Sequence, residues 1–390
     1  MTLTPTTSDE RAAIIEAVRD FAQTELAPHA LEWDEHKHFP REALGLAGEL
    51  GLGGIYVRED VGGSGLSRSD AAAIIEELAV ADPAIAAYIS IHNMVAWMID
   101  TYGSEEQRQA WLPKLTAMTD FGAYCLTEPG AGSDAAALAT SATRDGDEYV
   151  LTGVKQFISG GGEASVYIVM ARTGDPSTGS GTGGARGISA FLVPGDSAGL
   201  SFGAIEKKMG WNAQPTRQVI LDEVRLPASA LLGSLGQGFK IAMSGLNGGR
   251  VSIAACSLGG AQFALDKALQ YVHERYTFGE PLAEKQAVVF ALADMATELH
   301  AARALVRDAA AALDEKAPDA AMRCAMAKRF ATDAGFRIAN EALQLHGGYG
   351  YLHDYGIEKV VRDLRVHQIL EGTNEIMRVI IGRELLGGAR

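Results

Sequence analysis

The sequence predicts an α+β protein built from three consecutive domains. The expected units are an N-terminal all-α domain (residues 1–123), a middle antiparallel β-domain (124–236) and a C-terminal four-helix bundle (237–390). Three observations support this division: helical periodicity in the first third of the chain, short strand-like runs in the middle, and long helical patterns afterwards. Because helices and strands are segregated rather than alternating, separate α and β domains are favoured over a doubly wound sheet.

The first domain is expected to be helical throughout. Thr7 or Ser8 can cap a first helix whose apolar residues are Ile14, Ile15, Val18 and Phe21. The apolar stretch of residues 71–99 is interrupted by Glu76, Glu77, Asp82 and Pro83. A bilayer span needs ~20 mostly apolar residues in a row. We therefore expect buried helices here and no membrane segment.

The middle domain is recognised by short runs rich in β-branched and aromatic residues, bounded by glycine or proline. These runs are EYVLTG, SVYIVMAR, GISAFLVPG and TRQVILDEVRLP. Between the second and third runs lies GDPSTGSGTGGARG, residues 174–187. Its composition is that of an inter-domain linker, but strand-like runs flank it on both sides. A loop between strands of one domain is the favoured interpretation.

A narrow apolar seam in the last domain predicts helices that pack together. Its residues recur at alternating steps of four and three: Val288, Leu292, Met295, Leu299, Ala302, Val306, Ala309 and Leu313. Such a seam packs against other long helices, as in a four-helix bundle.

Composition excludes several classes of protein. The net charge of −15 argues against binding to nucleic acid or to an anionic membrane surface, which needs a local positive excess. The three cysteines form no C-x-x-C pair, so neither a disulfide framework nor a zinc site is expected. The N-terminus resembles neither a signal peptide nor a transit peptide. We expect a cytoplasmic protein, or the mature form of a mitochondrial matrix protein in a eukaryote.

Most motifs with a chemical role are weak or missing. Residues 130–135, GAGSDA, match G-x-G-x-x-A, but no alternation of strand and helix surrounds them, which disfavours a Rossmann site. A turn whose backbone N–H groups line a ligand is the better interpretation. The histidines show no metal-ligand spacing, so no metal is expected. No G-x-S-x-G elbow or P-loop occurs.

Two glycine pairs interrupt helical patterns in the last third of the chain. Asn247, Gly248, Gly249 and Arg250 follow one another in an apparent helix, where each glycine costs about 1 kcal/mol relative to alanine. QLHGGYGYL, residues 344–352, contains the second pair. Both pairs allow either a simple kink or turn, or the close approach of a planar ligand.

A lone carboxylate ends the apolar run VHQILEG. Glu371 stands before Gly372 and Thr373, and Thr373 can cap a following helix with Ile376, Val379 and Ile380 on its apolar face. Taken alone, the fragment allows two interpretations. Glu371 is either a helix-end residue facing water or a base held in a dry pocket.

Five motifs, in order along nearly the whole chain, resemble the acyl-CoA dehydrogenase family. They are YCLTEPGAGSDAA, FISGG, ERYTFGEPLAEKQ, QLHGGYGY and ILEGTNEIMR. The resemblance implies an FAD flavoenzyme that dehydrogenates an acyl-CoA thioester between its α- and β-carbons. It also implies a homotetramer and electron-transfer flavoprotein as the electron acceptor.

Site residues carry over from the resemblance by matching position. Glu371 corresponds to the catalytic base. The matching cofactor contacts are Tyr124, Leu126, Thr127, Ser133, Phe157, Ile158, Ser159, Arg275, Phe278, Gln286, Gln344, Gly347, Gly348, Thr373 and Glu375. Contacts to the acyl-CoA are expected from Ser133, Asn247, Arg250 and Arg383. Some of these contacts are expected to hold the pyrophosphate and adenosine parts of FAD across a subunit boundary, namely those from Arg275, Gln286, Gln344, Gly347 and Gly348.

The expected substrate is a short branched acyl-CoA. GWNAQPTR, GLNGGRVSIAACSLG and RVHQILEGTNEIMR resemble the members that act on isobutyryl-CoA in valine catabolism. Isovaleryl- and long-chain relatives take their base from the position of Gly249, which disfavours both subclasses. Butanoyl-CoA and 2-methylbutanoyl-CoA remain alternative substrates. An alternative of another class is a non-catalytic acyl-CoA-binding protein.

Overall fold

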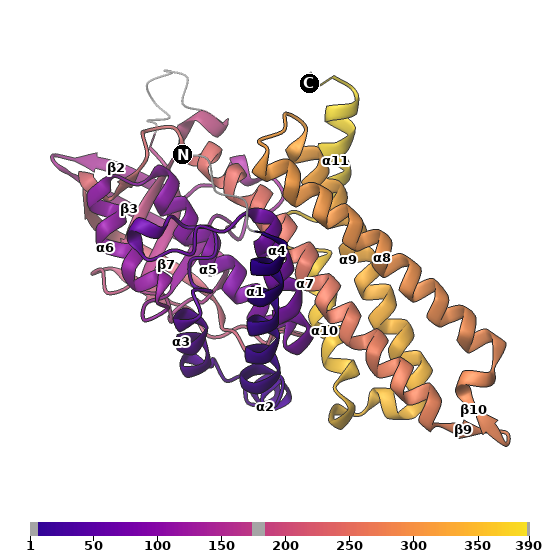
Figure 1. Ribbon diagram of the computed structural model, residues 1–390. Coiled ribbons are helices and arrows are strands. Elements are labelled where there is room, and N and C mark those ends of the chain that lie inside the picture. Colours follow the sequence, from indigo (N-terminus) through magenta and orange to yellow (C-terminus); the bar gives the residue numbers. More distant parts are fainter. Residues whose placement is uncertain (1–6, 174–183, 388–390) are drawn as a thin grey trace.

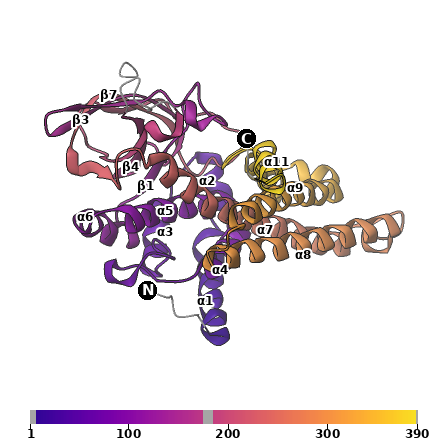
Figure 2. The same cartoon turned by 90° about the horizontal axis from the view of Figure 1, so that it is seen from above.

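A computed structural model of the chain describes residues 7–173 and 184–387, which form the three expected regions (Figures 1 and 2). The helices of the N-terminal region are α1 (Ser8–Phe21), α2 (Ala30–His36), α3 (Arg41–Glu49), α4 (Arg68–Ala81), α5 (Pro83–Tyr102) and α6 (Glu105–Thr116), with a π-helical turn at Ala22–Leu26.

Capping side chains define where α1, α4, α5 and α6 begin. The Thr7 hydroxyl accepts a hydrogen bond from the Glu10 N–H, and the Glu10 carboxylate accepts one from the Thr7 N–H. Asp82 caps α5 in front of Pro83, at the point where the long apolar stretch breaks into α4 and α5. In the described part of the chain, no helix is long and apolar enough to cross a membrane.

The middle region is a twisted sheet. Its strands are β1 (Gly122–Cys125), β2 (Ser141–Asp145), β3 (Glu148–Ser159), β4 (Val166–Arg172), β5 (Ile188–Pro194), β6 (Leu200–Phe202), β7 (Thr216–Pro227) and β8 (Leu231–Leu232). The strand order is β6-β7-β3-β2-β4-β5-β8, and β1 pairs with β4. Tyr167, Val169, Phe191 and Val193 on β4 and β5 are buried in the main core.

The expectation of an antiparallel sheet needs one correction. β1 runs parallel to β4, with Gly122 opposite Val166, and β2 meets β4 in a parallel pairing of Ser141 with Arg172. The strand-like runs revealed where strands occur, but strand direction depends on how each strand enters the sheet. β1 arrives from α6 rather than through a hairpin, so its direction was not fixed by a tight turn.

The glycine-rich loop joins two neighbouring strands of this sheet. β4 and β5, on its two sides, are paired antiparallel, with Val166 opposite Pro194. This pairing agrees with a loop inside one domain rather than a linker between domains. Residues 174–183 of the loop itself lie outside the described residues.

The C-terminal region is helical. Its helices are α7 (Gly238–Glu274), α8 (Gln286–Asp314), α9 (Ala320–His346), α10 (Ile357–His367) and α11 (Asn374–Leu385), and a small ribbon of β9 (Tyr276–Thr277) and β10 (Glu280–Pro281) follows α7. α7, α8, α9 and α10 pack together as a bundle, and α11 lies against α9. The apolar seam of α8 is buried from Met295 to Ala309, as its spacing predicts.

A buried ion cluster ties the three regions together. The Lys359 ammonium on α10 lies 3.0 Å from Asp82 of the N-terminal region and 2.8 Å from Asp363. Asp363 in turn accepts a hydrogen bond of 2.6 Å from the Trp211 backbone N–H of the middle region. Burial disfavours the charged form of Lys359, but two facing carboxylates outweigh it and raise the pKa of this lysine.

Candidate active site

Glu371 lies in the short connection between α10 and α11. Its φ is +56° and that of Gly372 is +87°, so the chain passes through two left-handed residues in succession. The residue as a whole is partly exposed, yet its carboxylate oxygen Oε2 is buried and has no hydrogen-bond partner among the described residues. A left-handed glutamate with a buried, unpaired oxygen is an energetically costly arrangement, of the kind that functional sites retain.

The environment of Glu371 raises its pKa, so the carboxyl holds its proton more strongly than it would in water. Burial raises the pKa of this carboxyl to about 7, although the positive charges of Arg250 and Lys328 act in the opposite direction. A carboxylate whose pKa lies near neutrality is suited to general-base chemistry. Of the two interpretations that the sequence left open, the geometry agrees with the dry environment.

The glycine pair of α7 lies against this carboxylate. A Cβ placed on Gly249 would stand 2.6 Å from Glu371 Oε2, closer than carbon and oxygen can approach without contact strain. The Arg250 Nε–H donates to the Glu371 backbone carbonyl at 3.3 Å, and its other nitrogen donates to the Asn247 amide oxygen at 2.7 Å. Asn247 and Arg250 are therefore brought together with Glu371.

Tyr124, at β1, completes this group from the side of the sheet. Its hydroxyl is buried and has no hydrogen-bond partner among the described residues. Burial raises the pKa of the phenol well above its usual value, and the charge of Glu371 raises it further. Glu371 and Tyr124 thus interact electrostatically, and each has a buried oxygen without a hydrogen-bond partner among the described residues.

The loop after β1 and the end of β3 form a second part of the site. The Gln156 N–H donates to the Thr127 carbonyl at 2.8 Å, and the buried Lys155 ammonium donates to the Leu126 carbonyl at 3.2 Å. Phe157 follows with φ +59° and a side chain 64% exposed. An aromatic ring held outward by a left-handed backbone offers a flat surface for a planar group.

The other predicted cofactor contacts of the middle region, Ile158, Ser159 and Ser133, differ in how far they are buried. The Ile158 side chain is buried in the core, so only its backbone remains for a cofactor. Ser159 ends β3 opposite Thr216 and is partly buried, and Ser133 is exposed in the loop after β1.

Thr373 begins α11. Its hydroxyl accepts a hydrogen bond from the Ile376 N–H at 3.3 Å, which confirms the predicted cap. Glu375 is exposed in the first turn, where its own backbone N–H and Thr373 lower its pKa. Arg383 is exposed near the other end of α11. Of the expected apolar face, Val379 is exposed and Ile376 and Ile380 are only partly buried. The fully buried apolar side chain of this helix is Met377, which was not part of the expected face.

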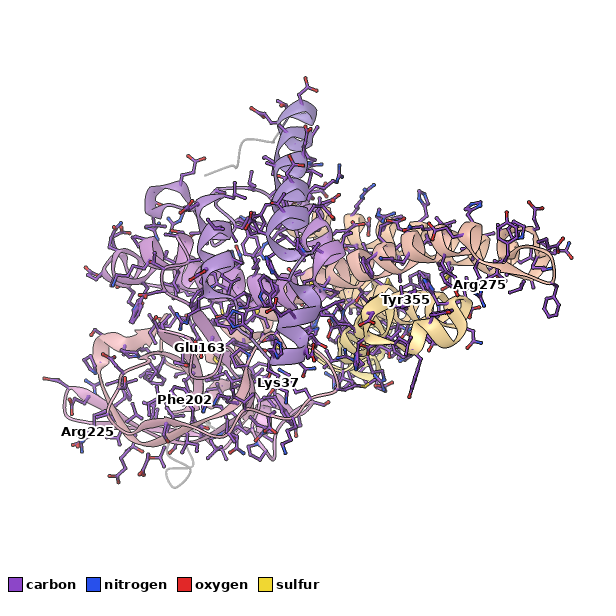
Figure 3. All side chains as sticks on the ribbon, turned by 90° about the horizontal axis from the view of Figure 1, so that it is seen from below. Lys37, Glu163, Phe202, Arg225, Arg275 and Tyr355 are labelled. Carbon is purple, nitrogen blue, oxygen red and sulfur yellow. The ribbon has the colours of Figure 1, made fainter. Side chains whose placement is uncertain are left out.

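Six predicted cofactor contacts lie elsewhere. They are Arg275, Phe278, Gln286, Gln344, Gly347 and Gly348, at the ends of α7, α8 and α9 around the β9–β10 ribbon. Figures 1 and 2 show this ribbon at the end of the bundle farthest from α11, and Figure 3 shows Arg275 at that end. Arg275 lies 5.6 Å from the Tyr349 ring, and Phe278 is 99% exposed. Within one chain these residues are not brought to Glu371.

Two side chains of the site, Lys328 and Arg68, were missed by sequence reasoning. Lys328 on α9 is fully buried and donates to the Gly372 carbonyl. The Arg68 guanidinium lies 3.6 Å from the Tyr56 ring centre, and its nitrogen would be 2.6 Å from a Cβ on Gly248. A charged residue inside the alanine-rich stretch CAMAKRFA was a usable signal for Lys328. Arg68 follows a helix cap, where a surface residue is the ordinary expectation.

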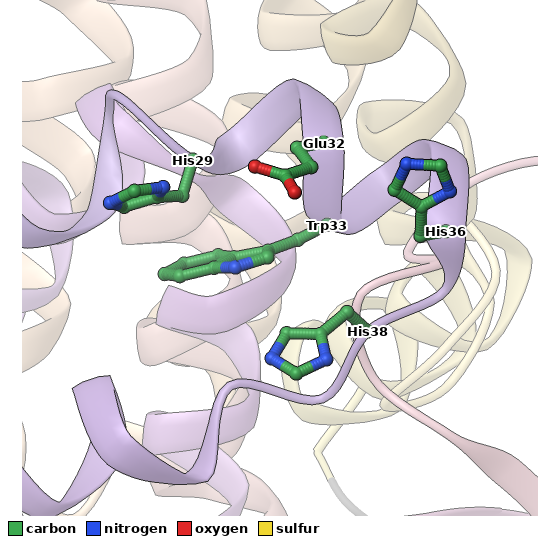
Figure 4. A pocket seen from close by; sticks show the side chains of 5 residues that line it. All are labelled: His29, Glu32, Trp33, His36 and His38. Carbon is green, nitrogen blue, oxygen red and sulfur yellow. The ribbon is translucent and has the colours of Figure 1, made fainter.

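A separate group of ionisable side chains lies on α2 and on the residues that flank this helix. Trp33 stands between His29, stacked at 5.4 Å, and His38 at 6.3 Å, with Glu32 and His36 nearby (Figure 4). Across residues 7–173 and 184–387, no group of His, Cys, Asp and Glu is arranged to hold a metal ion. None of the predicted site residues lines this hollow.

Comparison with known proteins identifies the family. Models of the N-terminal, middle and C-terminal domains of acyl-CoA dehydrogenase match residues 8–119, 123–224 and 236–386. The chain therefore belongs to the acyl-CoA dehydrogenase family, whose members are FAD-dependent oxidoreductases. The family, the three-domain fold and the enzyme class expected from the sequence are confirmed.

Two relatives are similar over most of the chain. The mitochondrial isobutyryl-CoA dehydrogenase of Dictyostelium discoideum is 57% identical over 94% of this chain and 86% of its own length. The mitochondrial isobutyryl-CoA dehydrogenase of Bos taurus is 53% identical over 97% of this chain and 89% of its own.

Solved structures share the fold. Butyryl-CoA dehydrogenase from Megasphaera elsdenii superimposes with a TM-score of 0.93 at 38% identity, covering 97% of this chain and 99% of that one. A chain in the structure of the electron transferring flavoprotein of Acidaminococcus fermentans gives 0.93 at 40% identity, covering 99% and 100%. A glutaryl-CoA dehydrogenase from Mycobacterium smegmatis in complex with FADH2 gives 0.91 at 31% identity, covering 99% and 96%.

The described residues fit a flavin. The exposed ring of Phe157, the loop backbone at Leu126 and Thr127, and the partnerless hydroxyl of Tyr124 offer a flat surface and polar groups beside Glu371. At the far end of the bundle, no atom of the described residues lies within 4 Å of a Cβ on Gly347 or Gly348, which leaves their backbone accessible.

Proposed function

We propose that this protein is a short branched-chain acyl-CoA dehydrogenase that converts isobutyryl-CoA to methacrylyl-CoA in valine catabolism. The observation that carries the proposal is the buried carboxylate of Glu371, whose Oε2 has no hydrogen-bond partner among residues 7–173 and 184–387 and whose pKa is raised to about 7. The choice of substrate is supported by two isobutyryl-CoA dehydrogenases that are 57% and 53% identical to the chain.

Glu371 acts as the general base in this proposal. A hydrogen α to a thioester carbonyl is only weakly acidic, so its removal needs a base that is unsolvated and positioned beforehand. Ionised Glu371 takes this proton onto its carboxylate. Arg250 and Lys328 offset the negative charge of the ionised form, and the closely packed backbone of Gly249 keeps water away from Oε2.

FAD, when bound, supplies the acceptor for the hydride that leaves the β-carbon. We propose that it is held by Tyr124, Leu126, Thr127, Ser133, Phe157, the Ile158 backbone, Ser159, Thr373 and Glu375. Ser133, Asn247, Arg250 and Arg383 are proposed to bind the acyl-CoA. The arginines suit the anionic CoA moiety in a chain of net charge −15.

A second copy of the chain completes the cofactor site in this proposal. The end of the bundle distal to α11 carries Arg275, Phe278, Gln286, Gln344, Gly347 and Gly348. Phe278 is 99% exposed there, and such an exposed aromatic side chain is typical of a surface that another protein covers. We propose a homotetramer, in which this end reaches the flavin of a neighbouring protomer. Sedimentation of the FAD-loaded protein tests this, because a monomer that retains FAD contradicts it.

Electron-transfer flavoprotein is the proposed electron acceptor. The proposal is supported by the likeness to a chain in the electron transferring flavoprotein structure of Acidaminococcus fermentans. The proposed location is the cytoplasm, or the mitochondrial matrix if the source is eukaryotic, as in the two mitochondrial relatives.

Anaerobic titration of the FAD-loaded protein tests the proposed function. Isobutyryl-, butanoyl-, 2-methylbutanoyl- and isovaleryl-CoA are added in parallel, and the visible flavin absorption is followed. We expect fastest bleaching with isobutyryl-CoA, with a preference of ~10- to 200-fold, because one methylene changes the fit in an apolar site by that much. Faster bleaching by another thioester contradicts the substrate, and a flavin that no thioester reduces contradicts the activity.

A further inference from the structure

A buried lysine forms hydrogen bonds to the segment of residues 371–374, which carries the proposed base. Lys328 on α9 is 0% exposed. Its ammonium donates to the Gly372 carbonyl at 2.8 Å and to the Asn374 amide oxygen at 2.9 Å. A buried ammonium is stable only where acceptors or negative charges surround it. Both of its acceptors belong to the three residues that follow Glu371.

Residues 371–374 have an unfavourable backbone conformation that other contacts must stabilise. Glu371 and Gly372 both have positive φ, a backbone conformation that is unfavourable for a residue with a side chain such as Glu371. Asn374 anchors the far side, because its amide nitrogen donates to the Asp333 carboxylate at 2.7 Å and to Thr332 at 3.0 Å. One face of α9 therefore holds the turn at several points.

Charges around Lys328 come from several elements. Arg250 faces it from α7, Glu375 from α11 and Asp333 from α9 itself, in addition to Glu371. Burial lowers the pKa of Lys328 to about 8, while Glu371 acts to raise it. The same lysine and Arg250 act against the burial that raises the pKa of Glu371. The base and the lysine are thus electrostatically linked as well as joined through the backbone.

We propose that Lys328 is a positioning residue for the catalytic base: it fixes the turn at residues 371–374 and supplies a positive charge that favours the ionised form of Glu371. The inference rests on the proposed role of Glu371. It adds a second residue, from helix α9, to the machinery that removes the proton.

The pH dependence of flavin reduction separates this role from a purely structural one. Anaerobic reduction of the FAD-loaded protein by saturating isobutyryl-CoA is followed from pH 5.5 to 9.5. The variants are Lys328→Met, which removes the charge and the donors, Lys328→Gln, which keeps a neutral donor, and Lys328→Arg, which keeps the charge. The matched control is Lys240→Met on α7, because Lys240 is exposed.

Loss of the charge is expected to make Glu371 harder to ionise. We expect the midpoint of the profile to rise by about one pH unit in Lys328→Met and Lys328→Gln, with ~10-fold slower reduction at pH 6 and recovery at high pH. Lys328→Arg is expected to restore the wild-type midpoint at least in part, and Lys240→Met to leave it unchanged.

An unshifted midpoint in FAD-loaded Lys328→Met overturns the proposal, even if the rate falls. If that variant does not retain FAD, Lys328→Gln decides, because its amide can still donate to Gly372. A wild-type protein that no thioester reduces contradicts the function itself, an outcome distinct from reduction with an unshifted midpoint.

Discussion

The carboxylate of Glu371 lies directly against the backbone of Gly249. A Cβ on this glycine would stand 2.6 Å from Oε2 and 2.8 Å from the carboxylate carbon. The two residues are far apart in sequence and meet because α7 runs past the connection between α10 and α11. Only a residue without a Cβ at position 249 leaves room for the Glu371 carboxylate in its observed position.

Gly249→Ala should displace the base without unfolding the protein. The atoms that the new methyl group meets are the end of a flexible side chain, so Glu371 moves rather than the helix. Alanine is favoured over glycine by about 1 kcal/mol within a helix, which offsets part of the strain. We expect retained FAD and reduction by isobutyryl-CoA slowed by ~100-fold.

The control for this variant is Gly45→Ala on α3. In the described part of the chain, no atom lies within 4 Å of a Cβ at Gly45, and the φ of this glycine is not positive. Its thermal stability should be equal or slightly higher, with unchanged reduction. A Gly249→Ala protein that is reduced as fast as the wild type would show that the position of Glu371 matters little.

Phe157→Ala should weaken retention of FAD. The ring is 64% exposed, and removing it takes away apolar contact area without leaving a core cavity. We expect a lower ratio of flavin to protein after gel filtration, with nearly unchanged stability of the flavin-free protein. Ile205→Ala, at another exposed apolar residue of the middle region, serves as the control. Equal flavin content in both variants contradicts the placement.

Glu371→Gln should stabilise the protein in a pH-dependent way. The folded pKa of Glu371 is about 7, above the ordinary value of 4.5, so folding favours the protonated form. The stability that this proton provides is complete below about pH 4.5 and lost as pH rises through about 7. Glutamine is always neutral, so the variant should gain ~1–3 kcal/mol at pH 8 and little at pH 5.

Chemical denaturation of the FAD-loaded Glu371→Gln protein at these two pH values measures the difference. Glu375→Gln is the control, because the pKa of Glu375 is lowered rather than raised. An equal effect of Glu371→Gln at both pH values would mean that the carboxylate is not held in a dry environment.

Lys359→Met should lower the folding stability of the protein. Removing the ammonium leaves Asp82 and Asp363 buried and facing each other without a counter-charge. Breaking a buried pair in this way costs ~3–5 kcal/mol. Lys114→Met removes a lysine whose side chain is 68% exposed, 3.8 Å from Asp120, and should cost less than ~1 kcal/mol. Similar denaturation midpoints for both variants would contradict the role of the cluster in joining the three regions.

The fold was predictable because local patterns and domain order agree. The helix cap at Thr7, the break at Asp82 and Pro83, and the seam of α8 follow from side-chain chemistry within a few residues. The parallel pairing of β1 with β4 was not predictable in the same way. It depends on the path of the chain between the strands, which a strand-like run does not record.

The site was predictable only in part, for a related reason. Glu371 could be found at the end of an apolar run, but its environment is built by α7, α9 and β1. The roles of Lys328 and Arg68 come from contacts across the fold, and single residues in helices resemble ordinary surface or core positions. The residues around Arg275 match the family motifs, yet one chain does not bring them to Glu371.

The most direct test of the account is anaerobic mixing of FAD-loaded Glu371→Gln with isobutyryl-CoA, beside the wild type. Glutamine keeps the shape of the side chain and cannot take the α-proton. We expect the variant to bind FAD and the thioester, seen as a change in the flavin spectrum, while its reduction is ~100- to 10,000-fold slower. Reduction at the wild-type rate would contradict Glu371 as the base.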